Sequence, residues 1–405
     1  MKYNTHMIKP AKLEFLYSEM ETIGADVKGI RLMLPKGEFK FIKVQQLPLR
    51  AVHILKQEML AKGAEAVVHK DVSTLKKETS DVLLMGTKKQ YWDVLKKLKL
   101  QPFGLKELGK EIEKVLKSEE KVYKEKILYA NGKQIKIGNK TLIIGILNVT
   151  PDSFSDGGKF NDLEQAVIHA KEMVENGADI IDVGGESTRP GHQEVSLEEE
   201  LSRVIPIIQR LVKEIDVPIS VDTYKAEVAK QAIEAGAHII NDVWGFKKDP
   251  NMAQVAAKLN VPVILMHNRF DLNYQSLMDD IIRDLYQSID LALEAGVNEE
   301  NIILDPGIGF AKTYEQNLIV MNRLEEIVSL GYPVLLGTSR KSIVGNTLNL
   351  PVDDRVEGTA ATIALGIAKG CQIVRVHDVK EMSRVAKMMD AMVYLHSVGI
   401  DRVKE

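Results

Sequence analysis

The chain has 405 residues, of which 45% are hydrophobic and 27% are charged, and its formal net charge is −3. These values are typical of a globular protein, and the length predicts two or three domains, or one barrel with an additional module. The single cysteine, Cys371, excludes an intramolecular disulfide framework. Residues 1–11 hold no apolar core of signal-peptide length, and no run approaches the roughly 18 apolar residues of a membrane span. We therefore expect a cytoplasmic protein with no membrane partner.

The sequence of residues 1–118 predicts a small α+β domain of unknown function. Strands are expected at Ile30–Leu34, Phe39–Val44, Ala66–His69 and Asp81–Met85, and helices at Ala51–Gly63 and Leu105–Leu116. Residues 1–120 hold 23 Lys and Arg against 16 Asp and Glu. This excess favours an anionic partner or, alternatively, a solvated lysine-rich surface. We expect no nucleic-acid partner, because the lysines are scattered and are not clustered with aromatic residues.

A Lys- and Glu-rich stretch, Ser118–Lys126, reads as the end of a helix and a linker. Beyond it, Lys126–Asn139 contains Asn131-Gly132 between two alternating runs. That dipeptide is typical of the primed turns that close two-residue β-hairpins. We expect this hairpin to plug the bottom of the next domain.

The chain from residue 126 to about 400 predicts a (β/α)8 barrel. Eight short, β-branched, apolar runs alternate with amphipathic stretches such as Glu164–Asn176, Leu197–Glu214 and Lys225–Ala235. The runs are Thr141–Val149, Asp179–Gly185, Pro218–Thr223, His238–Gly245, Val261–His267, Asn301–Gly309, Pro333–Ser339 and Ile373–His377. About 250 residues is the usual size of such a barrel. A doubly wound open sheet is the alternative fold, but it rarely needs eight such even units.

Polar residues follow all eight runs, where the active site of such a barrel lies. Taken singly, each has a structural explanation: Asp222, Asn241 or Asp305 as a helix cap, Lys341 as a solvated lysine of a first helical turn, and His267 or His377 as a satisfied structural histidine. A lysine in a first turn is disfavoured by the helix dipole, which favours a functional role for Lys341. Together, eight strand ends that carry polar groups toward one mouth favour a binding site.

The residue types at this mouth have a chemical logic. Asp222, Asn241 and Asp305 supply acceptors for a flat heterocycle with a guanidine-like edge, and Lys341 supplies a donor to its carbonyl or ring nitrogen. Arg375 and His377 follow the strand beside which such barrels commonly bind phosphate. Asn148 offers a hard oxygen that suits Mg²⁺, a cation that also holds substrate phosphates.

Two polar, glycine-containing loops complete the mouth. The first, Thr150–Gly158, carries Phe154, and the second, Gly185–His192, carries Arg189. Mobile lids that exclude water are the functional interpretation, and ordinary surface turns are the alternative.

These residues resemble a known family, the dihydropteroate synthases. Ile146–Gly158 and Gly184–Gly191 resemble its two long signatures. Five shorter elements follow in the family's order and spacing: Ser220–Thr223, Asn241–Val243, Asp305–Phe310, Ser339–Lys341 and Arg375–Asp378. The resemblance covers roughly residues 126–395, and the N-terminal extension departs from the usual single-domain enzyme.

The resemblance implies a transferase of folate biosynthesis and a sulfonamide target. The amine of p-aminobenzoate would attack the exocyclic methylene of 6-hydroxymethyl-7,8-dihydropterin diphosphate, giving 7,8-dihydropteroate and pyrophosphate. No protein nucleophile would be used, Mg²⁺ would be the cofactor, and related barrels are homodimers.

The resemblance also assigns residues to roles. Catalytic roles fall to Asp222, Lys341, Arg375, Asp156 and Arg189. The pterin would contact Asp222, Asn241, Asp305, Lys341 and Met266. The p-aminobenzoate pocket would consist of Thr188, Arg189, Pro190, Phe154, Phe310, Ser339 and Lys341, with Ser339 and the adjoining helix N-terminus at the carboxylate. The diphosphate would contact Asn148, Arg189, Arg375 and His377, with Asn148 on the metal.

Two functions of other classes stay open at this point. A pterin-binding methyltransferase domain would use the same barrel for methyltetrahydrofolate and keep Asp222, Asn241 and Asp305, but it needs no diphosphate site. A non-catalytic barrel that serves as partner or scaffold of the N-terminal module would not need the mouth residues at all. Release of pyrophosphate in the presence of p-aminobenzoate separates all three.

Overall fold

The computed structural model describes residues 3, 5–8, 13–74, 76–121, 125–149, 158–186 and 194–394. The chain divides into two compact units, Met1–Lys117 and Ser118–Glu405. Within the described ranges, no helix combines the length and the apolar character that crossing a membrane requires. A small α+β unit and a (β/α)8 barrel are both present, so the predicted fold class is confirmed.

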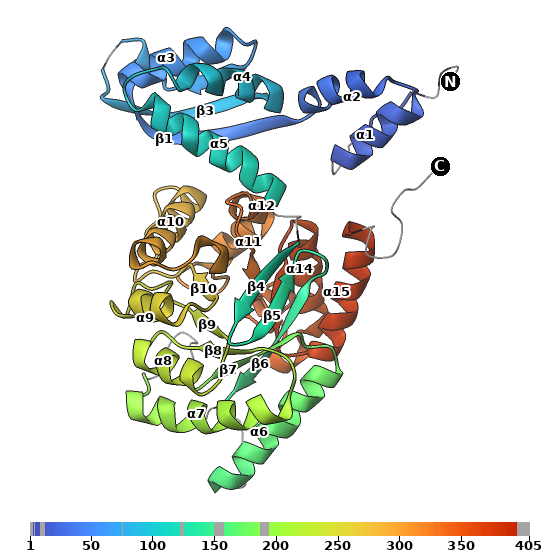
Figure 1. Cartoon of the computed structure of the whole chain (residues 1–405), viewed down its shortest axis with the longest axis vertical. Helices are drawn as coiled ribbons and strands as arrows, with labels where there is room; N and C mark the ends of the chain where they lie inside the picture. The colour runs from blue at the N-terminus through green and yellow to red at the C-terminus, as the bar shows by residue number, and fades with distance from the viewer. Residues whose placement is uncertain are drawn as a thin grey trace. The chain divides into compact units, whose positions relative to one another are not determined.

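The N-terminal unit is a three-stranded antiparallel sheet covered by helices (Figure 1). Its sheet has the order β1-β3-β2, in which β3 pairs with both neighbours. The elements are α1 (Leu13–Thr22), α2 (Val27–Met33), the 3-10 turn η1 (Leu34–Lys36), β1 (Phe39–Pro48), α3 (Leu49–Leu60), β2 (Glu65–Val68), η2 (Lys70–Val72), β3 (Thr79–Thr87), α4 (Lys88–Leu98) and α5 (Leu105–Lys121).

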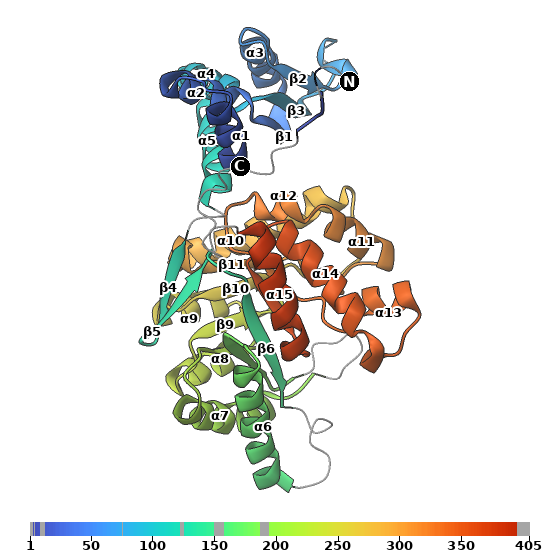
Figure 2. The ribbon, with the colours of Figure 1, turned by 90° about the vertical axis from the view of Figure 1, so that its right-hand side faces the viewer.

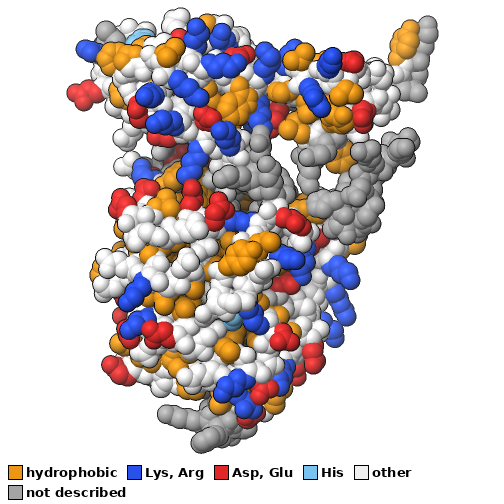
Figure 3. All heavy atoms as spheres, viewed as in Figure 1, with side chains coloured by type: hydrophobic (Ala, Val, Ile, Leu, Met, Phe, Trp, Pro, Cys, Tyr) orange, Lys and Arg blue, Asp and Glu red, His pale blue; other side chains and the backbone are white. Residues whose placement is uncertain are grey.

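One face of this sheet carries the core of the unit. Along β3, Val82 and Leu84 are buried and pack with apolar side chains of α3, α4 and α5, whereas Leu83 between them is 37% exposed. Alternation of this kind is expected for a sheet with one buried face. On the surface seen in Figure 3, Lys and Arg side chains are spread over the unit among hydrophobic ones.

The predicted strand at Ile30–Leu34 is wrong, because this segment lies in α2 and the turn after it. Asp26 caps the helix by accepting hydrogen bonds from the backbone N–H groups of Lys28 and Gly29. A short apolar run does not distinguish a strand from a helix by periodicity, and the cap decides the outcome here. Helix α4 was not predicted, although Thr87 and Gln90 form the capping box that begins it.

The barrel contains eight parallel strands that alternate with helices (Figures 1 and 2). The strands are β6 (Leu142–Asn148), β7 (Ile180–Gly184), β8 (Ile219–Asp222), β9 (Ile239–Asp242), β10 (Val263–Met266), β11 (Ile302–Asp305), β12 (Leu335–Leu336) and β13 (Ile373–Val376). A parallel bridge between Leu304 and Val334 joins the two edges of this sheet, at β11 and next to β12. The sheet is therefore closed into a barrel, and the alternative of an open sheet is wrong.

The helices between and after the strands complete the unit. They are α6 (Gly158–Glu175), α7 (Leu197–Glu214), α8 (Ala226–Glu234), α9 (Met252–Leu259), α10 (Leu277–Ala295), the turn η4 (Glu299–Asn301), α11 (Tyr314–Asn322), α12 (Leu324–Val328), α13 (Ser342–Leu348), η5 (Val352–Asp354), α14 (Val356–Ala368) and α15 (Val379–Val393). Outward side chains of the strands, such as Ile181, Val183 and Val221, share one apolar core with these helices.

The predicted hairpin consists of β4 (Lys126–Ala130) and β5 (Lys133–Ile137). Asn131 and Gly132 form its turn with φ of 49° and 82°, the positive values that a type I′ turn requires. Leu128, Ile135 and Ile137 form one buried cluster with the inward side chains at the start of the strands. The hairpin therefore plugs the N-terminal end of the barrel, as predicted.

We expect Leu128→Ala to lower the free energy of unfolding of the barrel by about 2–5 kcal/mol, because it leaves a cavity under the strands. Leu128 is 1% exposed and its neighbour Ile127, on the other face of the hairpin, is 42% exposed. Ile127→Ala is therefore the matched control, with an expected loss below about 1 kcal/mol. Urea midpoints of the two variants check this, and equal shifts would show that the hairpin does not act as a plug.

Candidate active site

A row of aligned residues crosses four neighbouring strands, β6 to β9, at the C-terminal end of the barrel. The register aligns Asn148 with Gly184, Gly184 with Asp222, and Asp222 with Asn241. A Cβ on Gly184 would lie 3.7 Å from Asp222 Oδ2 and 3.8 Å from Asn148 Oδ1, so the glycine leaves open space between these two oxygens. The structure thus brings Asn148, Asp222 and Asn241 together.

Arg375 lies between two buried carboxylates below this row. Its Nε–H donates to Asp182 Oδ2 at 2.6 Å, and its Nη2 donates to Asp222 Oδ2 at 2.7 Å. Asn241 Nδ2 donates to the same oxygen of Asp182 at 3.2 Å. Burial raises the pKa of the Asp222 carboxyl, and the charge of Arg375 opposes this rise.

Asp182 was not predicted to belong to the site, although it is fully buried at its centre. It occurs inside an apolar run, Ile180–Gly184, and reads there as part of a strand. The signal that identifies it is the two-residue alternation: Asp182 and Gly184 share a face, and Gly184 aligns with Asp222.

A second pair, Asp305 and Lys341, faces the same interior. A Cβ on Gly337 would lie 3.8 Å both from Asp305 Oδ2 and from Lys341 Nζ, so the carboxylate and the ammonium flank this glycine. Asp305 Oδ1 accepts from the N–H of Gly307 at 2.7 Å, and Lys341 Nζ donates to Ile308 O at 2.5 Å. Burial lowers the pKa of Lys341 to about 8, and the charge of Asp305 opposes this shift.

An apolar wall adjoins these charged groups. Met266 at the end of β10 is buried with Tyr224 and Val243, and Phe310 packs against this cluster. Lys341 Nζ lies 4.7 Å from the centroid of the Phe310 ring, within the range of a cation–π contact. The mouth thus combines a flat apolar surface with acceptors and one ammonium.

The loops after β12 and β13 are tied to each other. Ser339 Oγ accepts from the backbone N–H of His377 at 3.1 Å and lies 3.0 Å from its ring Nδ1. Arg340, with φ of 57°, forms a bidentate ion pair with Asp378 at 3.0 and 2.5 Å. These contacts bring Ser339 and His377, which the sequence assigned to different substrates, next to each other and tie the two loops together.

Other polar residues at the strand ends turn away from the interior. His267 points outward from β10 and contacts Asp284 and Lys312, which confirms its structural alternative. Asp242 accepts from the N–H groups of Trp244 and Phe246 and so shapes the turn after β9. The loop residues expected in the site, Phe154, Asp156, Thr188, Arg189 and Pro190, lie outside the described residues.

Three buried oxygens in this region accept no hydrogen bond from the described part of the chain: Asp182 Oδ1, Ser220 Oγ and Asp222 Oδ1. Because unpaired buried acceptors are costly, they indicate that a ligand with donors belongs here. Among the described residues, no group of three or more His, Cys, Asp or Glu side chains is arranged to hold a metal ion. A cavity of about 510 Å³ beside Asn131, Lys133 and His238 lies at the opposite, hairpin end and is not part of this site.

Comparison with known proteins agrees with this geometry. Residues 144–377 match the family described as "Pterin binding enzyme". The dihydropteroate synthase of Clostridium beijerinckii is 66% identical over 262 residues, which are 64% of this chain and 97% of that protein. That of Bacillus subtilis is 62% identical over 266 residues, covering 66% of this chain and 93% of its own length.

Solved structures give the same result. A Clostridium difficile dihydropteroate synthase crystallised in the presence of pteroic acid is 55% identical, with a TM-score of 0.62, and the match covers 63% of this chain and 98% of that one. A Yersinia pestis dihydropteroate synthase in complex with a sulfonamide drug is 43% identical, with a TM-score of 0.62, over 66% of this chain and 98% of that one. The chain therefore belongs to the family of pterin-binding enzymes, and it acts as a dihydropteroate synthase, a transferase of folate biosynthesis.

Proposed function

We propose that the barrel binds the dihydropterin inside its C-terminal end. The contacts would be Asp222, Asn241, Asp305 and Lys341, and one face of the pterin ring would lie on Met266. The observation that carries this assignment is the unpaired, buried Asp222 Oδ1 beside Asp182 Oδ1. A 2-amino-4-oxo pterin presents N–H donors along one edge, and carboxylates accept such donors in pairs. Lys341 adds a donor for the ring carbonyl or ring nitrogen from the opposite side.

The same arrangement supports a reaction without a protein nucleophile. The amine of p-aminobenzoate forms a bond to the exocyclic methylene of the pterin, the bond from that methylene to the diphosphate oxygen breaks, and pyrophosphate leaves. Positive charge that develops on the pterin is stabilised by the preorganised carboxylate of Asp222. The attacking nitrogen releases one proton to solvent as the new bond forms, so the reaction needs orientation of the arylamine and not covalent catalysis.

Arg375 is suited to the departing diphosphate as well as to the two carboxylates. A guanidinium has five N–H donors, and the bonds of Arg375 to Asp182 and Asp222 use one on Nε and one on Nη2. The other three make no hydrogen bond within the described part of the chain and would donate to phosphate oxygens, and His377 follows on the same strand. Arg375 would thus shift part of its charge from Asp222 to the leaving group as the pterin becomes positive.

The arylamine pocket would lie beside Phe310 and Ser339. Phe310 offers a ring face next to Met266, and Ser339 offers a hydroxyl near His377. Thr188, Arg189, Pro190 and Phe154 stay predictions for this pocket, as does Asp156 for catalysis. Because the Yersinia pestis relative holds a sulfonamide drug, we propose that sulfonamides bind this pocket too.

Magnesium fits this site as a cation held mainly by the substrate. Asn148 Oδ1 faces the interior near Asp222, and it is a neutral, hard oxygen of the kind that Mg²⁺ accepts while keeping phosphate and water ligands. When bound, Mg²⁺ neutralises charge on the diphosphate. The expected homodimer and cytoplasmic location likewise stay predictions.

Purified protein should release pyrophosphate only when both dihydropterin diphosphate and p-aminobenzoate are present, and EDTA should abolish this release. A coupled pyrophosphate assay measures both effects, with added Mg²⁺ as the control for recovery. Full activity in EDTA would refute the magnesium proposal. Pyrophosphate release that does not depend on p-aminobenzoate would refute the proposed reaction.

Asp305→Asn should weaken pterin binding with little change in melting temperature. The substitution keeps the shape but replaces an acceptor by a donor that faces the N–H groups of the pterin, a mismatch worth about 1–3 kcal/mol. Calorimetric titration with a pterin and thermal melting check the two parts. A variant that binds pterin normally but melts early would show that Asp305 serves the fold through its bond to Gly307.

A chain that begins at Ser118 should fold and keep kcat/KM within about tenfold of the full chain, or roughly 1.4 kcal/mol of transition-state stabilisation. All described residues of the site belong to the barrel unit, and the Clostridium beijerinckii relative is matched over 97% of its own length by 262 residues of this chain. Ser118 is kept because it packs closely on Gly331. A truncated barrel with a normal circular dichroism spectrum and no activity would show that residues 1–117 contribute to the site.

A further inference from the structure

A buried lysine lies behind the loop that follows β11. Lys312 is 9% exposed and lies two residues after Phe310. Its Nζ lies 2.8 Å from His267 Nδ1, 3.0 Å from Gly307 O and 3.1 Å from Phe310 O. An ammonium has three N–H donors and no acceptor, so these three partners satisfy it completely.

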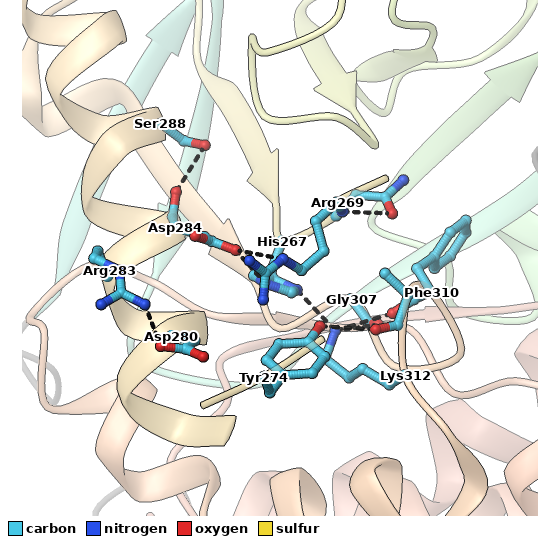
Figure 4. A network of polar contacts seen from close by, with 12 residues as sticks. His267, Arg269, Tyr274, Asp280, Arg283, Asp284, Ser288, Gly307, Phe310 and Lys312 are labelled. Atoms are coloured by element: carbon cyan, nitrogen blue, oxygen red, sulfur yellow. Dashed lines mark hydrogen bonds and ion pairs between the residues drawn. The ribbon is translucent and has the colours of Figure 1, made fainter. Parts of the chain in front are cut away.

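The histidine in this group has a defined orientation and tautomer. When Lys312 is charged it only donates, so His267 Nδ1 then accepts from Lys312, and the proton of the ring lies on Nε2, which faces Asp284 Oδ2 at 3.2 Å. Burial, and then the charge of Lys312, lowers the pKa of His267 to about 3, so the ring is neutral. Figure 4 shows the resulting line from Asp284 on α10 through His267 to Lys312.

This line ends on the backbone of the segment Gly307–Phe310. Gly307 has φ of 65°, and a Cβ there would lie 2.0 Å from His267 O, so the segment is packed against the end of β10. Lys341 holds the carbonyl of Ile308 from the barrel interior, whereas Lys312 holds the carbonyls of Gly307 and Phe310 from the outside.

The two substrates depend on this segment to different degrees. Asp305, the proposed pterin ligand, is the last residue of β11, and its backbone is fixed by pairing with Met266 on β10, although its Oδ1 also accepts from the N–H of Gly307 in this segment. Phe310, the proposed arylamine contact, lies beyond the strand, and Lys312 donates to its carbonyl.

We propose that Lys312 is a positioning residue for the arylamine: it fixes the Gly307–Phe310 backbone, and through it the Phe310 ring, by an ammonium that His267 and Asp284 hold in place. This inference rests on the proposed role of Phe310. Burial of an ammonium costs several kcal/mol, which an apolar side chain of similar length would avoid. Burial lowers the pKa of Lys312 to about 7, and the charge of Asp305 opposes this shift.

The test compares Lys312→Met with Lys247→Met in the full chain. Lys247 is the matched control, because burial also lowers its pKa and its Nζ donates to a loop carbonyl, Asn268 O, at 2.6 Å. Loss of ammonium–carbonyl bonds should raise KM for p-aminobenzoate roughly tenfold or more in Lys312→Met. The affinity for pterin and kcat should change by less than about threefold, and Lys247→Met should leave KM within about twofold. Equal effects of the two variants, or an unchanged KM in Lys312→Met, would overturn the proposal.

A double-mutant cycle with Phe310→Ala shows whether Lys312 acts through that ring. Lys312→Met should raise KM for p-aminobenzoate by less than about twofold when Phe310 is already absent, because coupled residues are not additive. Additive effects would overturn the proposal. If Phe310→Ala alone leaves KM unchanged, the proposed arylamine pocket is wrong, and the assignment to Lys312 falls with it for that separate reason.

Two further variants apply if Lys312→Met does not fold. Lys312→Arg keeps the charge and should have a KM for p-aminobenzoate within about threefold of the wild type. His267→Gln keeps an acceptor for Lys312 but loses the contact to Asp284, and it should raise KM by an intermediate factor at a normal melting temperature. A wild-type KM in His267→Gln, or a KM in Lys312→Arg that rises tenfold, would contradict the proposal.

Discussion

The structure depends on one arrangement of charges, a single guanidinium shared by two buried carboxylates. Arg375 extends from β13 past β6 to reach Asp182 on β7 and Asp222 on β8, so its contacts join three strands across a span of four. Charges buried in a protein must be paired, and removing one partner typically costs about 3–5 kcal/mol. Two carboxylates with one guanidinium still leave an excess of negative charge and two unpaired oxygens, Asp182 Oδ1 and Asp222 Oδ1. The barrel therefore holds an environment that favours a ligand with N–H donors and a developing positive charge.

The opposite end of the same strands is apolar, and the change from one character to the other follows the two-residue alternation. Along the inward face of β13, Ile373 belongs to the cluster under the hairpin, Arg375 pairs with the carboxylates, and His377 reaches the mouth. The hairpin closes the apolar end, which keeps water away from the underside of the ion pairs and strengthens them. The residues that stabilise the fold and those proposed to bind substrates thus lie at opposite ends of each strand. The apolar residues lie at the N-terminal end and the polar ones at the C-terminal end, next to the loops.

The sequence was sufficient for the barrel, the hairpin plug and most described mouth residues, because these follow from local signals: a run, a turn dipeptide, and the end of a strand. Asp182 was missed because its partner Arg375 is 193 positions away, and only closure of the barrel brings β13 near β7. Lys312 was missed for a similar reason, since its partner His267 precedes it by 45 positions. The strand predicted at Ile30–Leu34 was wrong for a different reason. Five residues are too few to show whether apolar residues repeat with the period of a strand or of a helix, and Asp26, which caps the helix, lies outside the run.

Two lysines hold the segment Gly307–Phe310 from opposite sides, and this divides the recognition of the two substrates. Lys341 reaches Ile308 O from the interior, where its own charge faces the pterin site, and burial lowers its pKa to about 8. Lys312 reaches Gly307 O and Phe310 O from a position that faces helix α10 instead. The proposed pterin ligands Asp222, Asn241 and Asp305 are strand residues whose positions are set by the backbone pairing of the barrel. The proposed arylamine contacts Phe310 and Ser339 lie on loops beyond the paired strands, so side chains that bind loop carbonyls would have to fix their positions. On this proposal, a charged residue behind a loop determines the affinity for the arylamine as much as a residue in the pocket does.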